Sequence, residues 1–450
     1  MKKRVLFQII LFILIFSCNN VKDEKQVPFE KLSNDVTGIN FSNIITPDIE
    51  TSENLFDYDY FYNGSGVGIA DINNDGLKDV LFTANQEMNR LFLNKGNLTF
   101  EDISELSNIN TKNKKWSSGV TFADVNNDGW IDIYISQGGP YDSNSRKNLL
   151  LINNQDLTFS EKAEEYGLDD NGISTQSAFF DFDKDGDLDC VVMNENEFFG
   201  YDPISFFKKY ENKSVLMENS SHLYEQKDGK FINITEKAGL LSPTFGLGLC
   251  ISDINNDNWP DIYIANDYYV KDAMYINNQD GTFTNQIKES TKQISFYGMG
   301  VDIEDINNDN LSDIFVLDMA SSDHVRSKTL MASMNTSNFD LITNKLDQHY
   351  QYMFNSLQLN LGNDKYHNIS HQLNIAKTDW SWAGLIFDYN LDGNEDIFVT
   401  NGYRKYGSDN DSRIRINETK RQYNNKVPVE MKKRLYDELP SEKLPNLLYK

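Results

Sequence analysis

The nonapeptide Asp-Ile-Asn-Asn-Asp-Gly-Leu-Lys-Asp at residues 71–79 is the first of six copies of one pattern. Each copy has the form Asp-x-Asn/Asp-x-Asp-Gly/Asn-x-x-Asp, and the copies begin at Asp71, Asp124, Asp181, Asp253, Asp305 and Asp388. Successive copies start 52 to 83 residues apart. A repeat a little over fifty residues long suits one four-stranded blade of a β-propeller better than a helical hairpin.

The sequences around each copy predict strands. A glycine-rich stretch such as Gly66-Val67-Gly68-Ile69-Ala70 precedes the loop, and a β-branched or aromatic run such as Val80-Leu81-Phe82 follows it. Glycine suits an innermost strand that other backbones approach closely. Two further runs, at 89–94 and 98–100, also recur, which predicts four strands per repeat. Because fifty residues bury little core alone, stacked blades are favoured over tandem small β domains. The sequence predicts an all-β propeller of six or seven blades over residues 29–450, with short helical insertions.

The two ends and two insertions leave alternatives open. Residues 28–33 are predicted to be an outer strand and residues 445–450 a third strand. Either these ends complete one blade and close a six-bladed ring, or the chain stops inside a truncated seventh unit. The insertion near 321–355 is expected to form short helices, as a lid, a partner surface or packing against a blade. The insertion near 404–444 is highly charged, and is expected to be solvated, with a helix from Pro428 through Leu439.

The repeated loops are candidate calcium sites. Side-chain oxygens stand at positions 1, 3, 5 and 9, the carbonyl of position 7 can point the same way, and Ca²⁺ accepts six to eight oxygens. Position 6 is Gly or Asn, which enter the left-handed region readily. Strands rather than helices flank the loops, which excludes an EF-hand. An Asx-turn without metal explains a single copy, but six complete copies favour up to six Ca²⁺ ions. The predicted metal ligands are Asp71, Asn73, Asp75, Leu77 and Asp79; Asp124, Asn126, Asp128, Trp130 and Asp132; Asp181, Asp183, Asp185, Asp187 and Asp189; Asp253, Asn255, Asp257, Trp259 and Asp261; Asp305, Asn307, Asp309, Leu311 and Asp313; and Asp388, Asn390, Asp392, Asn394 and Asp396.

The charge balance agrees with a bound metal and excludes one class of partner. The 450 residues carry a net charge of -26, and 39% of them are apolar, so a disordered acidic tail is excluded. Such an acidic chain opposes sequence-independent nucleic-acid binding. Calcium would relieve the repulsion within each loop, so we expect it to stabilise the fold.

The first residues predict export and lipidation. Residues 1–17 combine Lys2, Lys3 and Arg4 with an apolar run too short for a comfortable membrane span, which is typical of a signal peptide. The following Cys18 resembles the lipidated cysteine of a bacterial lipoprotein lipobox, and residues 18–28 would form a tether. Lys22-Asp23-Glu24 resembles the export tag of surface lipoproteins in Bacteroidetes-like bacteria. We therefore expect an outer-membrane lipoprotein exposed on the cell surface and attached only through its lipid. Cys190 and Cys250 lie in apolar runs and indicate no disulfide framework.

The glycine-rich strand, acidic loop and Asp-Ile-Tyr-Ile type strand recur together over residues 56–402. This combination resembles the FG-GAP/VCBS repeat proteins, which include the integrin α-chain propeller and the ASPIC/UnbV-type bacterial relatives of cartilage acidic protein. The resemblance implies a calcium-loaded propeller used for adhesion or ligand binding. The bacterial relatives often end in a further C-terminal domain, which is not seen here and favours the truncated alternative.

The second-to-third-strand loops are the candidate ligand face, opposite the acidic loops. Tyrosines recur there beside carboxylates, at Tyr141, Tyr201, Tyr268, Tyr269 and Tyr403. They suit a sugar or a protein partner, or alternatively cap blade edges.

A search for enzyme motifs finds no Gly-x-Ser-x-Gly elbow, His-Glu-x-x-His helix or phosphate loop. His367 and His371 indicate only a polar surface. The chain is therefore expected to be a non-enzymatic, calcium-binding surface protein that holds an extracellular glycan or protein in adhesion or capture. The alternative is a polysaccharide lyase or glycoside hydrolase that uses Asp142, Asp202 or Asp267 with a tyrosine.

Overall fold

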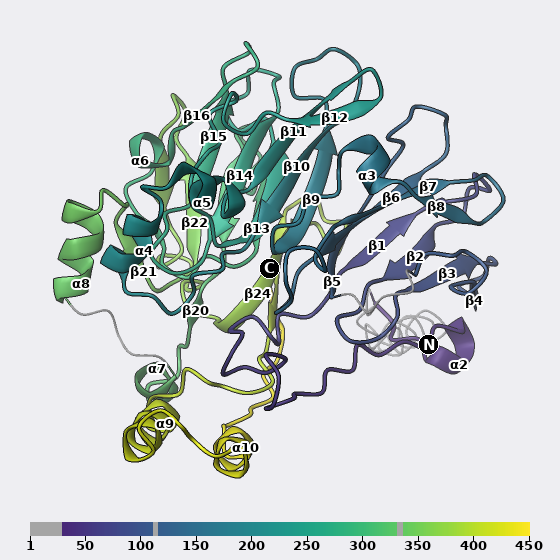
Figure 1. The fold of residues 1–450 in the computed structure, drawn as a ribbon. Helices are drawn as coiled ribbons and strands as arrows, with labels where there is room; N and C mark the ends of the chain where they lie inside the picture. Colours follow the sequence, from purple (N-terminus) through teal and green to yellow (C-terminus); the bar gives the residue numbers. More distant parts are fainter. Residues whose placement is uncertain (1–28, 111–115, 331–335) are drawn as a thin grey trace, which may run out of the picture.

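Six antiparallel sheets of four strands are arranged around a central channel (Figure 1). This computed structural model describes residues 29–110, 116–330 and 336–450. The predicted signal peptide, Cys18 and the 18–28 tether lie outside the described residues. The predicted β-propeller is confirmed, with six blades. No helix in the described part of the chain is long and apolar enough to cross a bilayer.

The first four blades are meanders, with each strand hydrogen-bonded to the next along the chain. The strands of the first two blades are β1 Val67–Ala70, β2 Asp79–Phe82, β3 Arg90–Asn94, β4 Phe100–Asp102, β5 Ser117–Ala123, β6 Asp132–Gln137, β7 Leu149–Asn153 and β8 Phe159–Glu161. Those of the next two are β9 Ser174–Phe180, β10 Asp189–Asn194, β11 His222–Lys227, β12 Lys230–Asn233, β13 Gly246–Ser252, β14 Asp261–Asn266, β15 Ala273–Asn277 and β16 Phe283–Asn285.

The last two blades contain longer insertions. The fifth blade is β18 Val301–Glu304, β19 Asp313–Val316, β22 Ser356–Asn360 and β23 Tyr366–Asn368. The sixth is β20 Met319–Ala320, β24 Asp379–Phe387, β25 Asp396–Asn401 and β26 Leu447–Tyr449. A short parallel pair, β17 Ile294–Ser295 and β21 Gln351–Tyr352, stands apart. The helices are α2 Asn34–Thr37, α3 Ala163–Tyr166, α4 Pro203–Lys209, α5 Lys213–Glu218, α6 Ile287–Ser290, α7 Arg326–Thr329, α8 Thr336–Asp340, the π-helix η1 Leu341–Lys345, α9 Asn410–Gln422 and α10 Val429–Asp437.

The core lies between neighbouring blades. Leu81 and Leu91 of the first blade share one buried cluster with Ile133 and Leu151 of the second, and the later blades pair in the same way. The innermost strands come so close that a Cβ added at Gly248 would lie 2.4 Å from the Met299 carbonyl oxygen. The predicted role of glycine on the inner strands is therefore confirmed.

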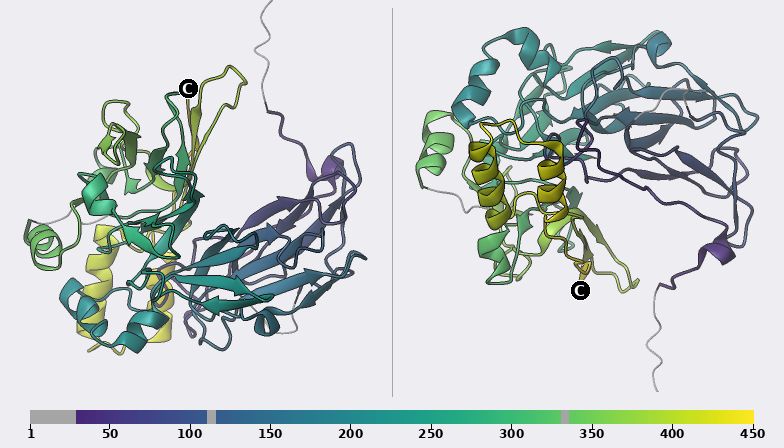
Figure 2. Two further views of the ribbon diagram at one scale, coloured as in Figure 1. Left: turned by 90° about the horizontal axis from the view of Figure 1, so that it is seen from above. Right: turned by 60° about the horizontal axis from the view of Figure 1, so that its bottom comes forward.

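The first and last blades do not pack face to face as the other neighbours do. On β1, Val67 and Ile69 remain 58% and 64% exposed, and on β24 Leu385 is 48% exposed. Figure 2 shows these two blades diverging away from the channel. β26 is the predicted third strand and pairs with β25, but residues 29–33 form no strand. The suggested completion of one blade by both ends is not observed.

The two insertions are partly folded against the propeller. In the first, Ile342 of η1 and Leu330 are buried in separate core clusters. In the second, α10 begins after Pro428 as predicted, but Tyr436 is 2% exposed and its ring meets Phe56 edge-on. The prediction that this insertion is solvated holds for most of its residues, but α10 buries Tyr436 against the segment that precedes the first blade.

Candidate metal loops and ligand pocket

The six acidic loops share one hydrogen-bonded geometry. In the first loop, the Gly76 N–H donates to Asp71 Oδ2 at 2.8 Å, and the Leu77 N–H donates to Asp75 Oδ1 at 2.8 Å. Both bonds recur in all six loops, which gathers the carboxylates of positions 1 and 5 around each turn. In the first five loops, the position-9 carboxylate accepts from the position-2 N–H, as Asp79 does from Ile72 at 3.0 Å.

Two backbone positions of each loop have positive φ angles. Position 6 does so as expected, with φ 86° at Gly76 and 68° at Asn258. Position 4 also has a positive φ angle, even where the residue is Lys184 (φ 61°) or Leu391 (φ 58°). The sequence did not predict this second positive φ angle. Where position 4 is Asn, its amide can reach the next blade: Asn256 Nδ2 donates to the Asn310 carbonyl oxygen at 2.8 Å. Such bonds link the loops of the first and second, the fourth and fifth, and the fifth and sixth blades.

The third loop has the most concentrated charge. Carboxylate oxygens of Asp181, Asp183 and Asp189 lie within 4.8 Å of one another. Burial raises the pKa of Asp189 to about 7. Nearby carboxylates also raise this pKa, whereas two backbone N–H donors lower it. Among the described residues, Asp181 Oδ1 and Asp187 Oδ1 are buried without a hydrogen-bond partner. Buried carboxylate oxygens without a donor are costly unless a cation meets them.

The sixth loop also has buried side-chain oxygens that lack a hydrogen-bond donor among the described residues. Asn390 Oδ1 and Asp396 Oδ2 are buried and have no partner within the described parts of the chain. The donor set of every loop is oxygen only, which is the chemistry Ca²⁺ prefers. The residues present therefore fit calcium.

A different arrangement occupies the opposite face, where residues 54–63 cross the mouth of the channel. Three tyrosine–carboxylate pairs tie this segment to the blades. Tyr58 donates to Glu195 at 2.8 Å, Tyr60 donates to Asp267 at 2.9 Å, and Tyr268 donates to Asp59 at 2.6 Å.

These carboxyls hold protons unusually tightly. Burial, with only partial relief from the Tyr58 hydrogen bond, raises the pKa of Glu195 to about 8. Burial raises the pKa of Asp267 to about 7, although hydrogen bonds from the Tyr268 N–H and the Tyr60 hydroxyl act to lower it. Burial also raises the pKa of Asp59. Near neutral pH Glu195 and Asp267 can therefore accept or donate hydrogen bonds.

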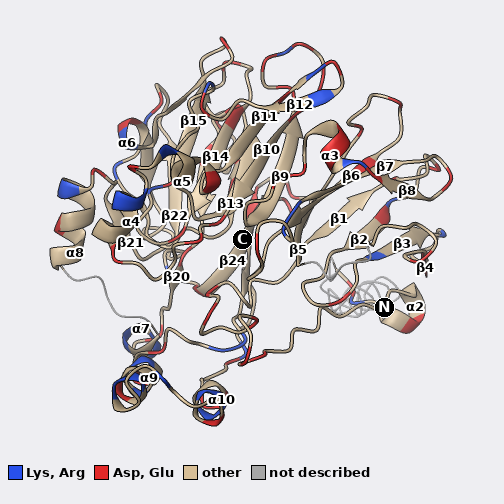
Figure 3. Ribbon diagram, in the orientation of Figure 1, with Lys and Arg blue, Asp and Glu red and all other residues tan. Residues whose placement is uncertain are grey.

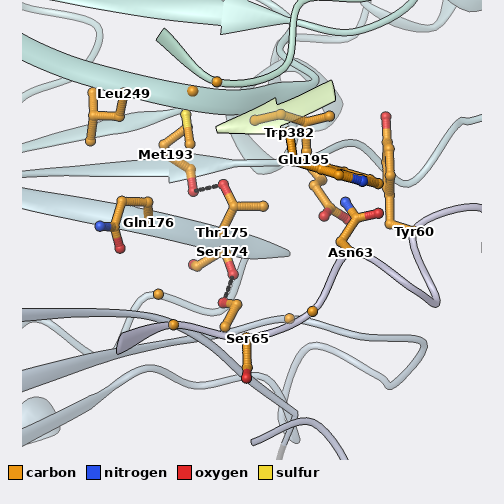
Figure 4. A pocket seen from close by; sticks show the side chains of 18 of the residues that line it. Tyr60, Asn63, Ser65, Ser174, Thr175, Gln176, Met193, Glu195, Leu249 and Trp382 are labelled. Atoms are coloured by element: carbon orange, nitrogen blue, oxygen red, sulfur yellow. Dashed lines mark hydrogen bonds between the residues drawn. The ribbon is translucent and has the colours of Figure 1, made fainter. Parts of the chain in front are cut away.

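Two cavities meet at this segment. The channel cavity has a volume of 390 Å³ and is lined by the inner strands, with Tyr60, Asn63, Glu195 and Trp382 at its mouth (Figure 4). The second cavity, called the loop-face pocket below, has a volume of 410 Å³. Tyr60, Asn63, Met299 and Trp382 line both cavities. Asn63 Oδ1 is buried and has no partner among the described residues.

Aromatic rings form much of the wall of the loop-face pocket. Trp380 stacks on Tyr403 at 4.7 Å between ring centroids, and Trp382 stacks on the same ring at 5.7 Å. Tyr268 and Tyr297 are also part of its lining. Helix α9 adds Arg413, Asn417 and Lys420, while Asp59 and Asp267 supply carboxyl groups. Stacked rings with a few converging polar groups are typical of a binding site for an amphipathic small ligand.

The predicted tyrosines are not gathered into one site. Tyr268 and Tyr403 line the loop-face pocket. Tyr269 is buried and donates to the Tyr201 carbonyl oxygen, and the Tyr201 ring is 45% exposed beneath Lys209. Tyr141 packs edge-on against a tryptophan and donates to Glu53.

The three carboxylates of the enzyme alternative are also separate. Asp267 lies in the loop-face pocket, but Asp142 is in an exposed turn where it accepts from the Asn144 N–H, and Asp202 caps α4. The sequence reasoning missed the contributions of residues 54–63 and α9. The regular spacing of Arg413, Asn417 and Lys420 along one helical face was the available signal.

The histidines and cysteines of the described residues add no second site. Cys190 and Cys250 are free thiols, and His367 and His371 are exposed. His222 is buried against Asp170 at 2.5 Å and its other ring nitrogen contacts the Met217 carbonyl oxygen, so both nitrogens have structural partners.

Comparison with known proteins identifies the repeat. Residues 62–135 and 253–316 match the FG-GAP-like repeat, and the blades that contain them belong to a six-bladed β-propeller. No curated protein matches the chain.

Several solved structures are similar to the chain. A lectin of Agrocybe aegerita, described as recognising non-reducing terminal N-acetylglucosamine, has 15% identity and a TM-score of 0.40, over 74% of this chain and 73% of that one. Rhamnogalacturonan lyase YesW has 10% identity and a TM-score of 0.37, over 77% and 57%. The V. cholerae biofilm matrix protein Bap1 has 12% identity and a TM-score of 0.33, over 58% and 36%. None of these similarities identifies a ligand for this chain.

Proposed function

We propose that this chain is a calcium-stabilised β-propeller, anchored at the cell surface through Cys18, that binds an extracellular glycan in the loop-face pocket without chemical turnover. The observation that carries the proposal is the pocket itself, in which Trp380, Tyr403 and Trp382 stack beside carboxyl and cationic groups. Aromatic faces bind the apolar faces of sugar rings, and the surrounding polar groups bind hydroxyls. A concave cavity of 410 Å³ suits one or two sugar units better than a flat protein surface.

Calcium has a separate supporting role on the opposite face. Side-chain oxygens of Asp181, Asp187 and Asn390, which are buried and have no hydrogen-bond partner in the described parts of the chain, favour a cation at the third and sixth loops. A bound ion would neutralise each acidic turn and hold the first two strands of its blade together. Residues 71–79 and their five counterparts would thus stabilise the scaffold rather than contact the ligand.

A protein ligand and a polysaccharide-degrading activity are the alternatives. The enzyme alternative is favoured by one observation, the Asp267 carboxyl, whose pKa burial raises to about 7 beside the Tyr60 hydroxyl. A carboxyl that titrates near neutral pH can act as a general acid or base.

The test measures retention of the full chain, in mild detergent with calcium, on a panel of neutral and acidic polysaccharides by affinity electrophoresis. We expect retention by at least one polysaccharide and its loss in Trp382→Ala, because the ring that forms the pocket wall is removed. Tyr201→Ala is the matched control, since this exposed ring lies outside the pocket. Retention that survives Trp382→Ala, or no retention by any polysaccharide, contradicts glycan binding in this pocket. Release of reducing or unsaturated ends during incubation would favour the enzyme alternative.

A further inference from the structure

Helix α9 presents cationic groups to the loop-face pocket. Arg413, Asn417 and Lys420 lie at helical spacing and all line this cavity. The Asp409 side chain caps the helix by accepting from the Ser412 N–H at 2.8 Å, and Ser412 is buried, which fixes this face toward the pocket. Figure 3 shows the Lys and Arg positions along α9.

The two cations are available to a ligand. Within the described residues, the Arg413 and Lys420 side chains have no ion pair or hydrogen bond, and both are exposed. Three other cations of the same insertion are engaged: Arg404 donates to the Ile45 carbonyl oxygen, Lys405 donates to the Tyr436 carbonyl oxygen, and Arg434 pairs with Glu438. In a chain with a net charge of -26, unpaired cations converging on an aromatic cavity are a feature that packing does not explain.

The carboxyls of the pocket do not neutralise these cations by contact. Asp59 accepts from the Tyr268 hydroxyl, and Asp267 accepts from the Tyr60 hydroxyl and the Tyr268 N–H. Arg413 lowers the pKa of Asp59 by electrostatic attraction, but among the described residues no hydrogen bond or ion pair joins the two side chains. The pocket therefore has a cationic rim on α9 and hydrogen-bonded carboxyls toward the blades.

We propose that the loop-face pocket binds an acidic sugar, with the ligand carboxylate at Arg413 and Lys420 and the sugar ring against Trp382. A guanidinium matches a planar carboxylate through two parallel hydrogen bonds, and an ammonium adds a second positive charge. The pocket carboxyls and Asn417 accept or donate hydrogen bonds to the sugar hydroxyls. This inference rests on the proposed function and names its ligand class.

The test compares an acidic trisaccharide with its uncharged ester and with a sulfated trisaccharide. Calorimetric titration of the full chain in calcium uses trigalacturonate, its methyl ester and a sulfated galactan trisaccharide. We expect trigalacturonate to bind at least about tenfold more tightly than the ester, with an advantage that falls as salt rises. In the double variant Arg413→Gln/Lys420→Gln, the affinity for trigalacturonate should fall by about tenfold or more while ester binding is unchanged.

A matched control separates pocket chemistry from net charge. Arg421→Gln/Lys426→Gln removes the same two charges from α9 and the turn after it, outside the pocket lining, and should leave both affinities unchanged. If acid and ester bind equally and the double variant has no effect, the acidic-sugar inference is overturned while the proposed function stands. Tighter binding of the sulfated trisaccharide overturns the carboxylate class. If no sugar, neutral or acidic, binds here or on the polysaccharide panel, the proposed function itself fails.

Discussion

Asp267 offers a direct test of the electrostatics of the loop-face pocket. Its side chain is 3% exposed, and it accepts from the Tyr60 hydroxyl at 2.9 Å and the Tyr268 N–H at 2.7 Å. In Asp267→Asn, the amide oxygen can still accept from the Tyr268 N–H, and the Tyr60 hydroxyl can rotate to accept from the new NH₂ group. The substitution therefore removes the titration while it keeps the shape.

The magnitude follows from the pKa of this carboxyl in the folded and unfolded chain. Burial raises its pKa from 3.8 to about 7 in the folded protein. The folded state then holds a proton that the unfolded state releases, so stability is fully present below about pH 4 and is lost as the pH rises through 7. Each pH unit in that window costs about 1.4 kcal/mol, which for this carboxyl gives a loss of about 2.5 kcal/mol between about pH 5 and about pH 8.

The assay is urea unfolding of wild type and Asp267→Asn, followed by tryptophan fluorescence at constant calcium. The unfolding free energy of the variant, relative to wild type, should rise by about 2.5 kcal/mol from about pH 5 to about pH 8. Titration of the acidic loops cancels in this difference, since both proteins share them. Glu105→Gln, at an exposed carboxylate, is the control and should track wild type. A difference in unfolding free energy that does not change with pH would refute the raised pKa of Asp267.

Three further predictions concern the scaffold. Without calcium, burial raises the pKa of Asp132 and Asp313 to about 6 and that of Asp261 to about 7, so in chelator the melting temperature should be higher near about pH 5 than near about pH 8. The rise in melting temperature on adding calcium should instead be larger near about pH 8, because the carboxylates are then free of protons. Scanning fluorimetry at both pH values checks the sign, and a calcium-induced rise that is larger at the lower pH would contradict the prediction. Gly248→Ala should destabilise the fold by about 1 to 3 kcal/mol, because the new Cβ would lie 2.4 Å from a backbone carbonyl oxygen of the next blade, and an unchanged urea midpoint would show that the inner strands are not so close. Asp181→Ala should lower the bound calcium by one ion per chain in metal analysis, whereas an unchanged count would remove the third loop from the set of sites.

Local sequence was enough to predict the blades and the acidic loops. Each loop lies between two strands with β-branched or aromatic residues, and its carboxylates bond to backbone N–H groups a few residues away. Position 4 was missed because its positive φ is imposed by the loop, even on Lys184 and Leu391, whose side chains do not favour that region.

The loop-face pocket was only partly predictable because its parts are distant in sequence. It combines residues 54–63, the loop after β14 and helix α9, which are far apart in the sequence and lie together in the folded chain. Tyr268 and Tyr269 were equivalent on the sequence, yet one lines the pocket and the other is buried, since Tyr268 has φ 57° and turns the chain there. The contacts of α10 were missed for a similar reason, because the partners of Tyr436 lie near the other end of the chain.

The most direct test of a calcium-stabilised propeller is thermal unfolding of the full chain with calcium and then with excess chelator, combined with metal counting by native mass spectrometry. A site occupied at one hundred times its dissociation constant adds about 2.7 kcal/mol to stability, so several filled loops should raise the melting temperature strongly. The account predicts about six calcium ions per chain, one for each of the six loops. A chain with no bound calcium and the same melting temperature in chelator would contradict it.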